Sequence, residues 1–195
     1  MTDTGDPPDA ALIRAAQAGD DPAFTLIMRR HKGWLYQFIR RYVTDRDDAY
    51  DVLQDCFVAA WGALARFDTE RPFEAWLRRI ALNKCRDRAR RNAVRRAALS
   101  LFGLAQDRLT PKEPDASAVT QANGVLRRLE TEIEKLPRPL KDALVLTALE
   151  GLTHKEAGDI LGGNAKAVET RVYRAKKRLA ERLDPGDLTD LTAEE

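Results

Sequence analysis

The spacing of apolar residues is the feature that most restricts how this 195-residue chain can fold. Between residues 10 and 92, apolar side chains recur every three or four positions, and the alternation typical of β-strands is scarce. The pattern breaks at residues 19–22, 44–45 and 68–72. Pro72, in the last of these breaks, suits the first turn of a new helix. The pattern therefore predicts an all-α domain with four helices.

A second helical block follows a stretch of different composition. From residue 97 to about residue 121 the helical pattern gives way to Gly, Pro and small residues, which bury little surface and are typical of a linker. Periodicity returns near residue 125. We therefore expect a disordered N-terminus at residues 1–9, a helical domain at 10–96, a flexible linker at 97–124, a second helical domain at 125–183 and an acidic tail at 184–195.

The composition favours a cytoplasmic protein with an ordinary core. Hydrophobic residues make up 44% of the chain, and two cysteines are too few for a disulfide scaffold. No apolar run approaches the roughly 20 residues that span a bilayer. The acidic start of the chain lacks the basic and then apolar order of a signal peptide. Cys56 and Cys85 are expected to be buried thiols, and a role as a redox-sensing pair stays open.

The second block contains the pattern of a helix-turn-helix motif. Thr153 and Glu156 have the spacing of a capping box, which predicts the start of a helix. The two glycines at 162–163 suit a left-handed turn, and Asn164 is a good cap for the next helix. Gly158, inside the first of these helices, costs up to about 1 kcal/mol relative to Ala. Two short helices joined by three residues are typical of a DNA-binding motif.

The helix after this turn has the properties of a DNA recognition helix. Val168, Val172, Ala175 and Leu179 form one apolar stripe, and residues 164–182 carry seven bases and two acids. A solvated basic helix is the simpler alternative, but the preceding cap, turn and helix favour a major-groove reader. The candidate DNA-binding residues of this helix are Lys166, Glu169, Thr170, Arg171 and Arg174.

The first block ends in a second basic segment. Residues 78–96 carry nine bases and one acid, which suits a surface that follows phosphates. Asn83 and Asp87 share one helical face and are polar groups able to read bases. Nearby aromatic residues, among them Phe73 and Trp76, are expected to pack in the core rather than to stack on bases. The candidate DNA-binding residues of this segment are Asn83, Arg86, Asp87, Arg90 and Arg91.

An acidic segment precedes this basic one. Residues 45–55 hold five aspartates and one arginine. Asp51, Gln54 and Asp55 share one side of the expected helix, and the apolar residues fall on the other side. No second carboxylate cluster or general base accompanies these aspartates, so a metal site is disfavoured. A basic protein surface is the expected partner of this anionic face.

Several ordered motifs resemble those of the extracytoplasmic-function, or group IV, sigma factors of bacterial RNA polymerase. The resemblance covers nearly all of residues 12–183. The matching segments are residues 12–20 (their opening helix), 51–61 (the helix that docks on the polymerase clamp), 73–83 with Asp87 and Arg90–Arg91 (the −10 reader), and 136–183 (the −35-binding domain).

The resemblance implies an all-α protein with a sigma region 2-like four-helix domain at residues 10–96 and a region 4-like helix-turn-helix domain at 125–183. It implies that Asp51, Gln54 and Asp55 bind the β′ clamp of core RNA polymerase, and that the second domain also contacts the β flap. It further implies that Asn83 and the loop at 67–71 capture a base flipped out of the melted promoter. An anti-sigma factor is an expected partner, and no cofactor, metal, membrane insertion or catalytic residue is expected.

Two other functions compete with this interpretation. A free-standing helix-turn-helix regulator usually dimerises to read paired half-sites, and the sequence shows no sustained heptad seam for a dimer. An enzyme acting on DNA, such as a recombinase or nuclease, needs a nucleophile or a metal cluster, and neither is evident from the sequence.

Overall fold

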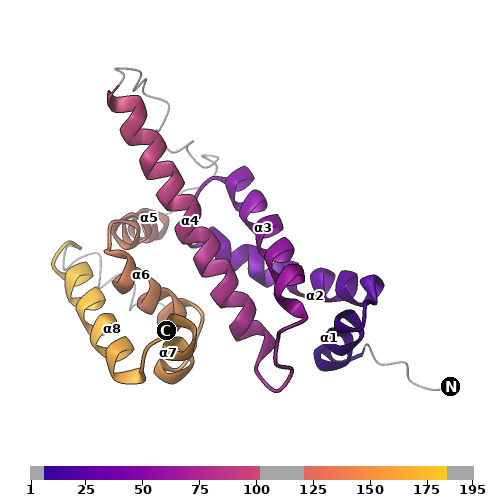
Figure 1. The fold of residues 1–195 in the computed structure, drawn as a ribbon. Coiled ribbons are helices and arrows are strands. Elements are labelled where there is room, and N and C mark those ends of the chain that lie inside the picture. The colour runs from indigo at the N-terminus through magenta and orange to yellow at the C-terminus, as the bar shows by residue number, and fades with distance from the viewer. Residues whose placement is uncertain (1–6, 102–120, 184–195) are drawn as a thin grey trace. The chain divides into compact units, whose positions relative to one another are not determined.

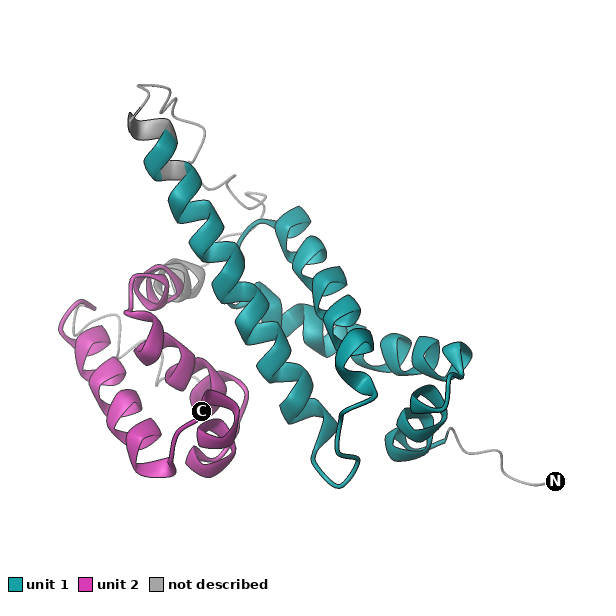
Figure 2. Ribbon diagram, viewed as in Figure 1, with its two compact units in different colours: residues 1–108 teal, residues 109–195 magenta. Residues whose placement is uncertain are grey.

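The computed structural model describes residues 7–101 and 121–183, and all the regular elements in these ranges are helices. The chain divides into two compact units, residues 1–108 and residues 109–195 (Figure 2). An all-α fold with two small helical domains is therefore confirmed. The expected acidic tail, most of the expected linker and most of the expected disordered N-terminus lie outside the described residues.

The described part of unit 1, residues 7–101, contains four helices, as the three breaks in the apolar pattern predict. Figure 1 shows their arrangement. They are α1 (Asp9–Gln17), α2 (Asp21–Arg40), α3 (Arg46–Leu64) and α4 (Phe73–Leu101). The side chains of Asp20 and Asp45 cap α2 and α3 by accepting hydrogen bonds from backbone N–H groups. Pro72 lies just before α4, where its carbonyl accepts from the N–H of Trp76. The helix α4 continues past residue 96 to Leu101, within the segment expected to be a linker.

The core of unit 1 lies between α2, α3 and α4, with α1 packed on α2. The expected inner stripe of α3 is buried, including Val52, Cys56 and Ala60. The largest fully buried side chains of this unit are Ile13, Ile27, Leu35, Phe38, Ile39, Val52, Leu64, Leu77 and Leu82. Burial of this apolar face, rather than helix propensity, holds the four helices together.

A polar side chain from α1 fixes the end of α3. The Nε2 atom of Gln17 donates to the carbonyl oxygens of Leu64 at 2.9 Å and Phe67 at 2.8 Å. The Leu64 carbonyl also accepts from Phe67 N–H at 2.9 Å, so the amide of Gln17 adds a second donor there and ties both carbonyls to α1. The contact joins the opening helix to the loop between α3 and α4.

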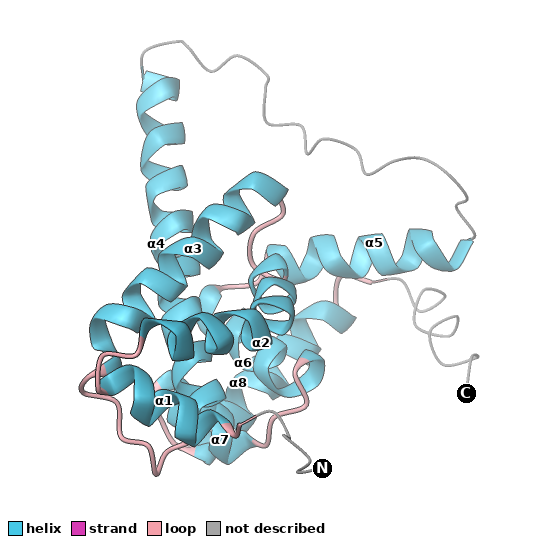
Figure 3. Cartoon of the chain, turned by 90° about the vertical axis from the view of Figure 1, so that its right-hand side faces the viewer, coloured by secondary structure: helices cyan, strands magenta, loops and turns pink. Residues whose placement is uncertain are grey.

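Unit 2 consists of short helices, shown from a second side in Figure 3. They are α5 (Gln121–Glu134), α6 (Arg138–Leu144), the π-helical turn η1 (Val145–Leu149), α7 (His154–Leu161) and α8 (Ala165–Ala180). The core forms where α8 packs against α6 and α7. Periodicity predicts the helices but not the π-helical turn, which continues α6 as far as Leu149.

The helix-turn-helix motif has the expected caps. Glu156 N–H donates to the Thr153 hydroxyl at 3.2 Å, and the Glu156 carboxylate accepts from Thr153 N–H at 2.8 Å. Gly162 has a φ of 70°, in the left-handed region, and the Asn164 side chain accepts from Ala167 N–H at 2.8 Å. These contacts fix where α7 ends and α8 begins.

Gly158 has a packing role that the sequence does not reveal. A Cβ atom at this position would lie 3.1 Å from the carbonyl oxygen of Gly163 and 3.2 Å from the carbonyl carbon of Asn164. The carbonyl oxygen of Gly158 also accepts a hydrogen bond from Gly163 N–H at 2.9 Å. The glycine therefore lets α7 approach the turn closely, which offsets its low helix propensity.

Candidate functional site

The helix α8 presents the face expected of a recognition helix. Its apolar stripe of Val168, Val172, Ala175 and Leu179 is buried, as the sequence predicts. The candidate residues Lys166, Glu169, Thr170 and Arg174 are exposed, and Arg171 is half-buried. Lys166 Nζ lies 3.0 Å from the Glu169 carboxylate, so the acid of this set is paired within the helix.

Tyr173 belongs to the same outer face and was missed by the sequence reasoning. It is 68% exposed and lies next to the exposed Arg174. A large exposed aromatic residue three positions after Thr170 suits a contact with thymine methyl groups or with phosphates. Helical spacing could have indicated this exposure, because a period of 3.6 residues places Tyr173 away from the apolar stripe.

The candidate −10 residues line an outer face of α4. Asn83, Arg90 and Arg91 are exposed, and Arg86 and Asp87 are half-buried. Asn83 Oδ1 lies 3.4 Å from Arg86 Nη1, and the Asp87 carboxylate pairs with Arg90. Hydrogen-bonding groups therefore alternate with cations on this face. Asn83 and Asp87 are four positions apart within α4, so they share a side of the helix, as the sequence predicts.

Two other arginines of this basic segment, Arg78 and Arg88, point toward other helices of unit 1 rather than outward from α4. Arg88 Nε donates to Asp48 Oδ2 at 3.1 Å. Arg78 lies over the Trp34 ring, 4.6 Å from its centroid, and donates to Glu74 at 3.0 Å. The sequence count of nine bases therefore overstates the charge that faces outward on α4.

The acidic residues of α3 also fall into two groups, one exposed and one in contact with α4. Asp51, Gln54 and Asp55, the candidate polymerase-binding set, are exposed. Asp48 points to α4, and its hydrogen bond with the Arg88 guanidinium holds the pKa of Asp48 below its usual value. The same hydrogen bond raises the pKa of Arg88. Asp51 and Asp55 make only long contacts with α4, to Arg88 at 3.7 Å and Arg91 at 3.9 Å, and stay exposed, whereas Asp48 stabilises the helix pair.

An aromatic cluster lies at the start of α4. The ring centroids of Phe67 and Trp76 are 4.7 Å apart, and Phe73 lies within 5.5 Å of both. Phe67 and Phe73 are buried, so the expectation of core packing holds for these two residues. Trp76 is half-buried at the edge of the cluster, beside the exposed face of α4.

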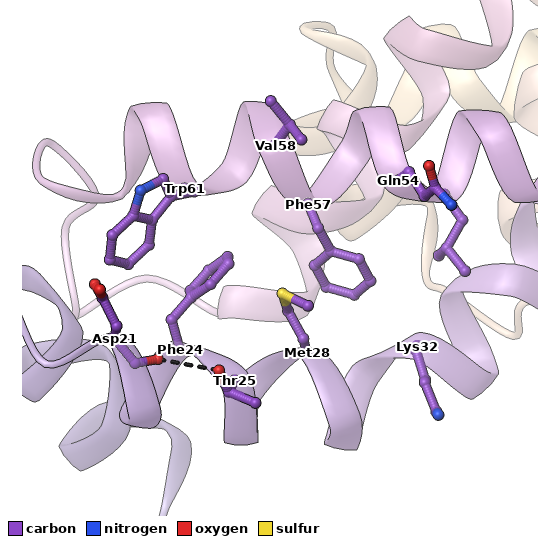
Figure 4. Close-up of a pocket in the computed structure, with 10 residues that line it drawn as sticks. Asp21, Phe24, Thr25, Met28, Lys32, Gln54, Phe57, Val58 and Trp61 are labelled. Carbon is purple, nitrogen blue, oxygen red and sulfur yellow. Dashed lines mark hydrogen bonds between the residues drawn. The ribbon is translucent and has the colours of Figure 1, made fainter.

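A cleft between α2 and α3 was not predicted from the sequence. It has a volume of about 680 Å³, and Phe24 and Met28 of α2 face Phe57 and Trp61 of α3 across it (Figure 4). Val58 of α3 lines its outer edge. Val58 is 72% exposed, which is unusual for a large apolar side chain. Gln54 also lines the cleft, so the cleft adjoins the candidate polymerase-binding face.

Neither cysteine is placed for redox or metal chemistry on the surface. Cys56 and Cys85 are buried free thiols, as expected, and burial raises the pKa of Cys56 above its ordinary value. Within residues 7–101 and 121–183, no group of three or more His, Cys, Asp or Glu side chains could hold a metal ion. In the same ranges, no helix is both long and apolar enough to span a bilayer.

Comparison with known proteins assigns the chain to a family. Residues 27–95 match Sigma-70 region 2, and residues 126–179 match Sigma-70, region 4. The RNA polymerase sigma factor CnrH of Cupriavidus metallidurans is 40% identical over 184 residues, which cover 91% of this chain and 96% of CnrH. The ECF RNA polymerase sigma-E factor of Haemophilus influenzae is 29% identical, again over 91% of this chain, and 96% of that protein is covered.

A solved structure agrees with the sequence comparison. The structure of CnrH in complex with the cytosolic domain of CnrY superposes with a TM-score of 0.65 at 38% identity, and covers 90% of this chain and 97% of that chain. A helix-turn-helix unit together with a four-helix unit thus defines a transcription initiation factor of the sigma-70 type. The chain belongs to the extracytoplasmic-function sigma factors of RNA polymerase.

Proposed function

We propose that this sigma factor binds core RNA polymerase through the exposed face of α3 and recognises two promoter elements, the −10 element through α4 and the −35 element through α8. The observation that carries the proposal is the division of unit 1 into an acidic outer face on α3 and a mixed basic and amide face on α4. Residues 10–96 and 125–183 are then its two functional domains.

The −10 element is read by the outer face of α4. The Asn83 amide has both a donor and an acceptor, as base-edge recognition requires. The neighbouring arginines Arg86, Arg90 and Arg91 bind phosphates, which fixes the register of the strand. Unstacking a base costs a few kcal/mol, and its capture near Asn83 and the loop at 67–71 offsets this cost and favours promoter melting.

The −35 element is read by the first half of α8 in the major groove. Thr170 and Arg174 lie on the exposed face, with Lys166 and Glu169 one turn earlier and Arg171 beside them. Arginine side chains pair with guanine, and the short Thr170 hydroxyl accepts or donates to either type of base. The buried stripe beneath these residues holds the helix in place during recognition.

The carboxylates of Asp51 and Asp55 attract a basic surface on the polymerase, for which the β′ clamp is the expected partner. The second domain reaches the β flap. The relative CnrH has been solved with the cytosolic domain of CnrY, which supports control of this chain by an anti-sigma factor that covers part of its surface. The chain acts in the cytoplasm, and it supplies promoter choice to the polymerase and performs no catalysis itself.

Charge variants separate the two kinds of surface. Replacing both Arg171 and Arg174 by Ala should weaken promoter binding by the holoenzyme about tenfold or more, and leave binding to core polymerase unchanged. Replacing both Asp51 and Asp55 by Lys should weaken core binding instead. Core binding is measured by fluorescence titration of labelled protein, and promoter binding by filter retention of the assembled holoenzyme. Loss of core binding on changing α8, or intact core binding after charge reversal on α3, would contradict the division.

A further inference from the structure

A series of ion pairs joins α3 to α4 and connects the two candidate surfaces of unit 1. Arg88 pairs with Asp48 and also lies 3.7 Å from Asp51, measured from Nη2 to Oδ2. Farther along, Arg91 Nη2 lies 3.9 Å from Asp55 Oδ2. We call these three contacts the α3–α4 ion-pair ladder. Two of its carboxylates, Asp51 and Asp55, belong to the proposed polymerase face, and Arg91 belongs to the proposed −10 face.

The two ends of the ladder differ in strength. Asp48 and Arg88 are 27% and 25% exposed at their side chains, two guanidinium nitrogens of Arg88 contact the carboxylate, and Asn92 Nδ2 lies 3.4 Å from Asp48 Oδ2. Asp55 and Arg91 are 51% and 62% exposed and share a single long contact. A bidentate, partly buried pair is held in one geometry, whereas an exposed single contact is easily exchanged for another partner.

At the exposed end of the ladder, Asp55 and DNA phosphates compete for Arg91. In the free chain the carboxylate of Asp55 attracts the Arg91 guanidinium and repels DNA phosphates nearby. A cation of the polymerase that pairs with Asp55 neutralises this carboxylate, so that Arg91 then interacts with phosphate without a competing anion. The inner pair of Asp48 and Arg88 stays formed and keeps the two helices in register.

We propose that the α3–α4 ion-pair ladder couples the two binding events of this sigma factor, because docking of polymerase on Asp55 releases Arg91 for the −10 DNA. This proposal rests on the proposed function and adds a regulation of its site. Coupling between sites is reciprocal, so bound DNA also strengthens polymerase docking. An exposed pair of this kind supports an effect of about two- to fivefold in affinity.

The test compares the contribution of Arg91 to DNA binding in the free chain and in the holoenzyme. A fluorescently labelled fork-junction DNA carries the −10 element of a promoter that the holoenzyme transcribes, and core polymerase alone gives the background. We expect Arg91→Ala to weaken binding two- to fivefold more in the holoenzyme than in the free chain. Arg90→Ala is the matched control, because Arg90 pairs with Asp87 on its own helix and its effect should be the same in both states.

A second arm examines the carboxylate directly in the free chain. Asp55→Asn should raise DNA affinity two- to fivefold, and this gain should vanish when Arg91 is Ala. Asp47→Asn, which removes the same charge from an exposed position of α3, should raise affinity less and equally in both backgrounds.

The outcomes separate the coupling from the underlying function. Equal losses for Arg91→Ala in the free chain and in the holoenzyme, or an Asp55→Asn gain that persists without Arg91, would overturn the coupling. No loss for either Arg90→Ala or Arg91→Ala in the holoenzyme would overturn the assignment of α4 to the −10 element, and the coupling with it.

Discussion

The Nε2 atom of His31 lies 2.8 Å from Oδ2 of Asp9, which joins the first residue of α1 to the middle of α2. The other ring nitrogen of His31 accepts from Trp34 Nε1 at 2.8 Å, so Nε2 carries the hydrogen and donates it to Asp9. Arg30 pairs with the other oxygen of Asp9. His31 also contacts Phe73 edge to face, with ring centroids 5.2 Å apart. Asp9 thus supports a buried histidine beside the start of α4.

Loss of this carboxylate should destabilise unit 1. Asp9→Ala removes the acceptor for His31 and the partner of Arg30, and leaves a buried ring N–H without its bond. We expect a loss of about 1–2 kcal/mol in the free energy of unfolding, measured by urea denaturation of the full chain monitored by tryptophan fluorescence. The control is Asp47→Ala, at an exposed position of α3. Equal effects of the two substitutions would show that the contact between α1 and α2 does not depend on Asp9.

The amide of Gln17 should matter for promoter opening. Gln17→Leu keeps the bulk of the side chain but removes both hydrogen bonds to the carbonyls of Leu64 and Phe67. The loop after α3 then loses its support, and we expect several-fold fewer open complexes at equal promoter occupancy, measured by permanganate reactivity of melted thymines. Gln37→Leu, at an exposed position of α2, is the control and should leave opening unchanged. An unaffected opening step in Gln17→Leu would exclude this support role.

A methyl group at Gly158 should strain the turn before α8. Gly158→Ala adds a methyl group 3.1 Å from the Gly163 carbonyl oxygen, so the turn before α8 must shift by a few tenths of an ångström. Although Ala is the better helix former, we expect a net loss of about 1 kcal/mol and weaker −35 binding. Thermal unfolding and binding to duplex promoter DNA measure the two effects. The opposite result, a more stable protein with full −35 affinity, would mean that the turn adjusts without cost.

The pair of Asp48 and Arg88 should make unit 1 sensitive to acid. Because Arg88 lowers the pKa of Asp48 in the folded chain, this stabilisation is fully present above the usual aspartate pKa of about 4, and is lost as the pH falls through the lowered value. We expect Asp48→Asn to cost about 1 kcal/mol at pH 7 and progressively less below pH 4, measured by urea denaturation at low salt. A cost that stays constant with pH would place its origin outside this ion pair.

The local parts of the fold follow from the sequence, and the contacts between distant residues do not. The apolar stripe of α3, the capping box at Thr153 and the left-handed Gly162 depend on neighbours within a few positions, so spacing predicts them. The pair of Asp48 and Arg88 spans 40 positions and exists only once α3 and α4 pack together. The close approach of Gly158 to Gly163 and Asn164 is more local, but it depends on the path of the turn after α7, which the apolar spacing does not give.

The same distinction holds for the candidate site. Charge and helical phase place the exposed sets on α3, α4 and α8, and those sets lie on accessible faces. The inward direction of Arg78 and Arg88 depends on Trp34 and Asp48, which belong to other helices. Tyr173 carries no charge, so the charge pattern of α8 does not single it out.

The most direct measurement of promoter choice is a map of the RNA 5′ ends made by purified core polymerase on genomic DNA, with and without this protein and with any inhibitor removed. With the protein present, we expect a new set of start sites that share two upstream sequence elements at a fixed spacing. The double replacement of Arg171 and Arg174 by Ala should abolish most of these sites. If the protein binds the polymerase stably but the start sites are the same as those of core polymerase alone, its assignment as a promoter-specificity factor is contradicted.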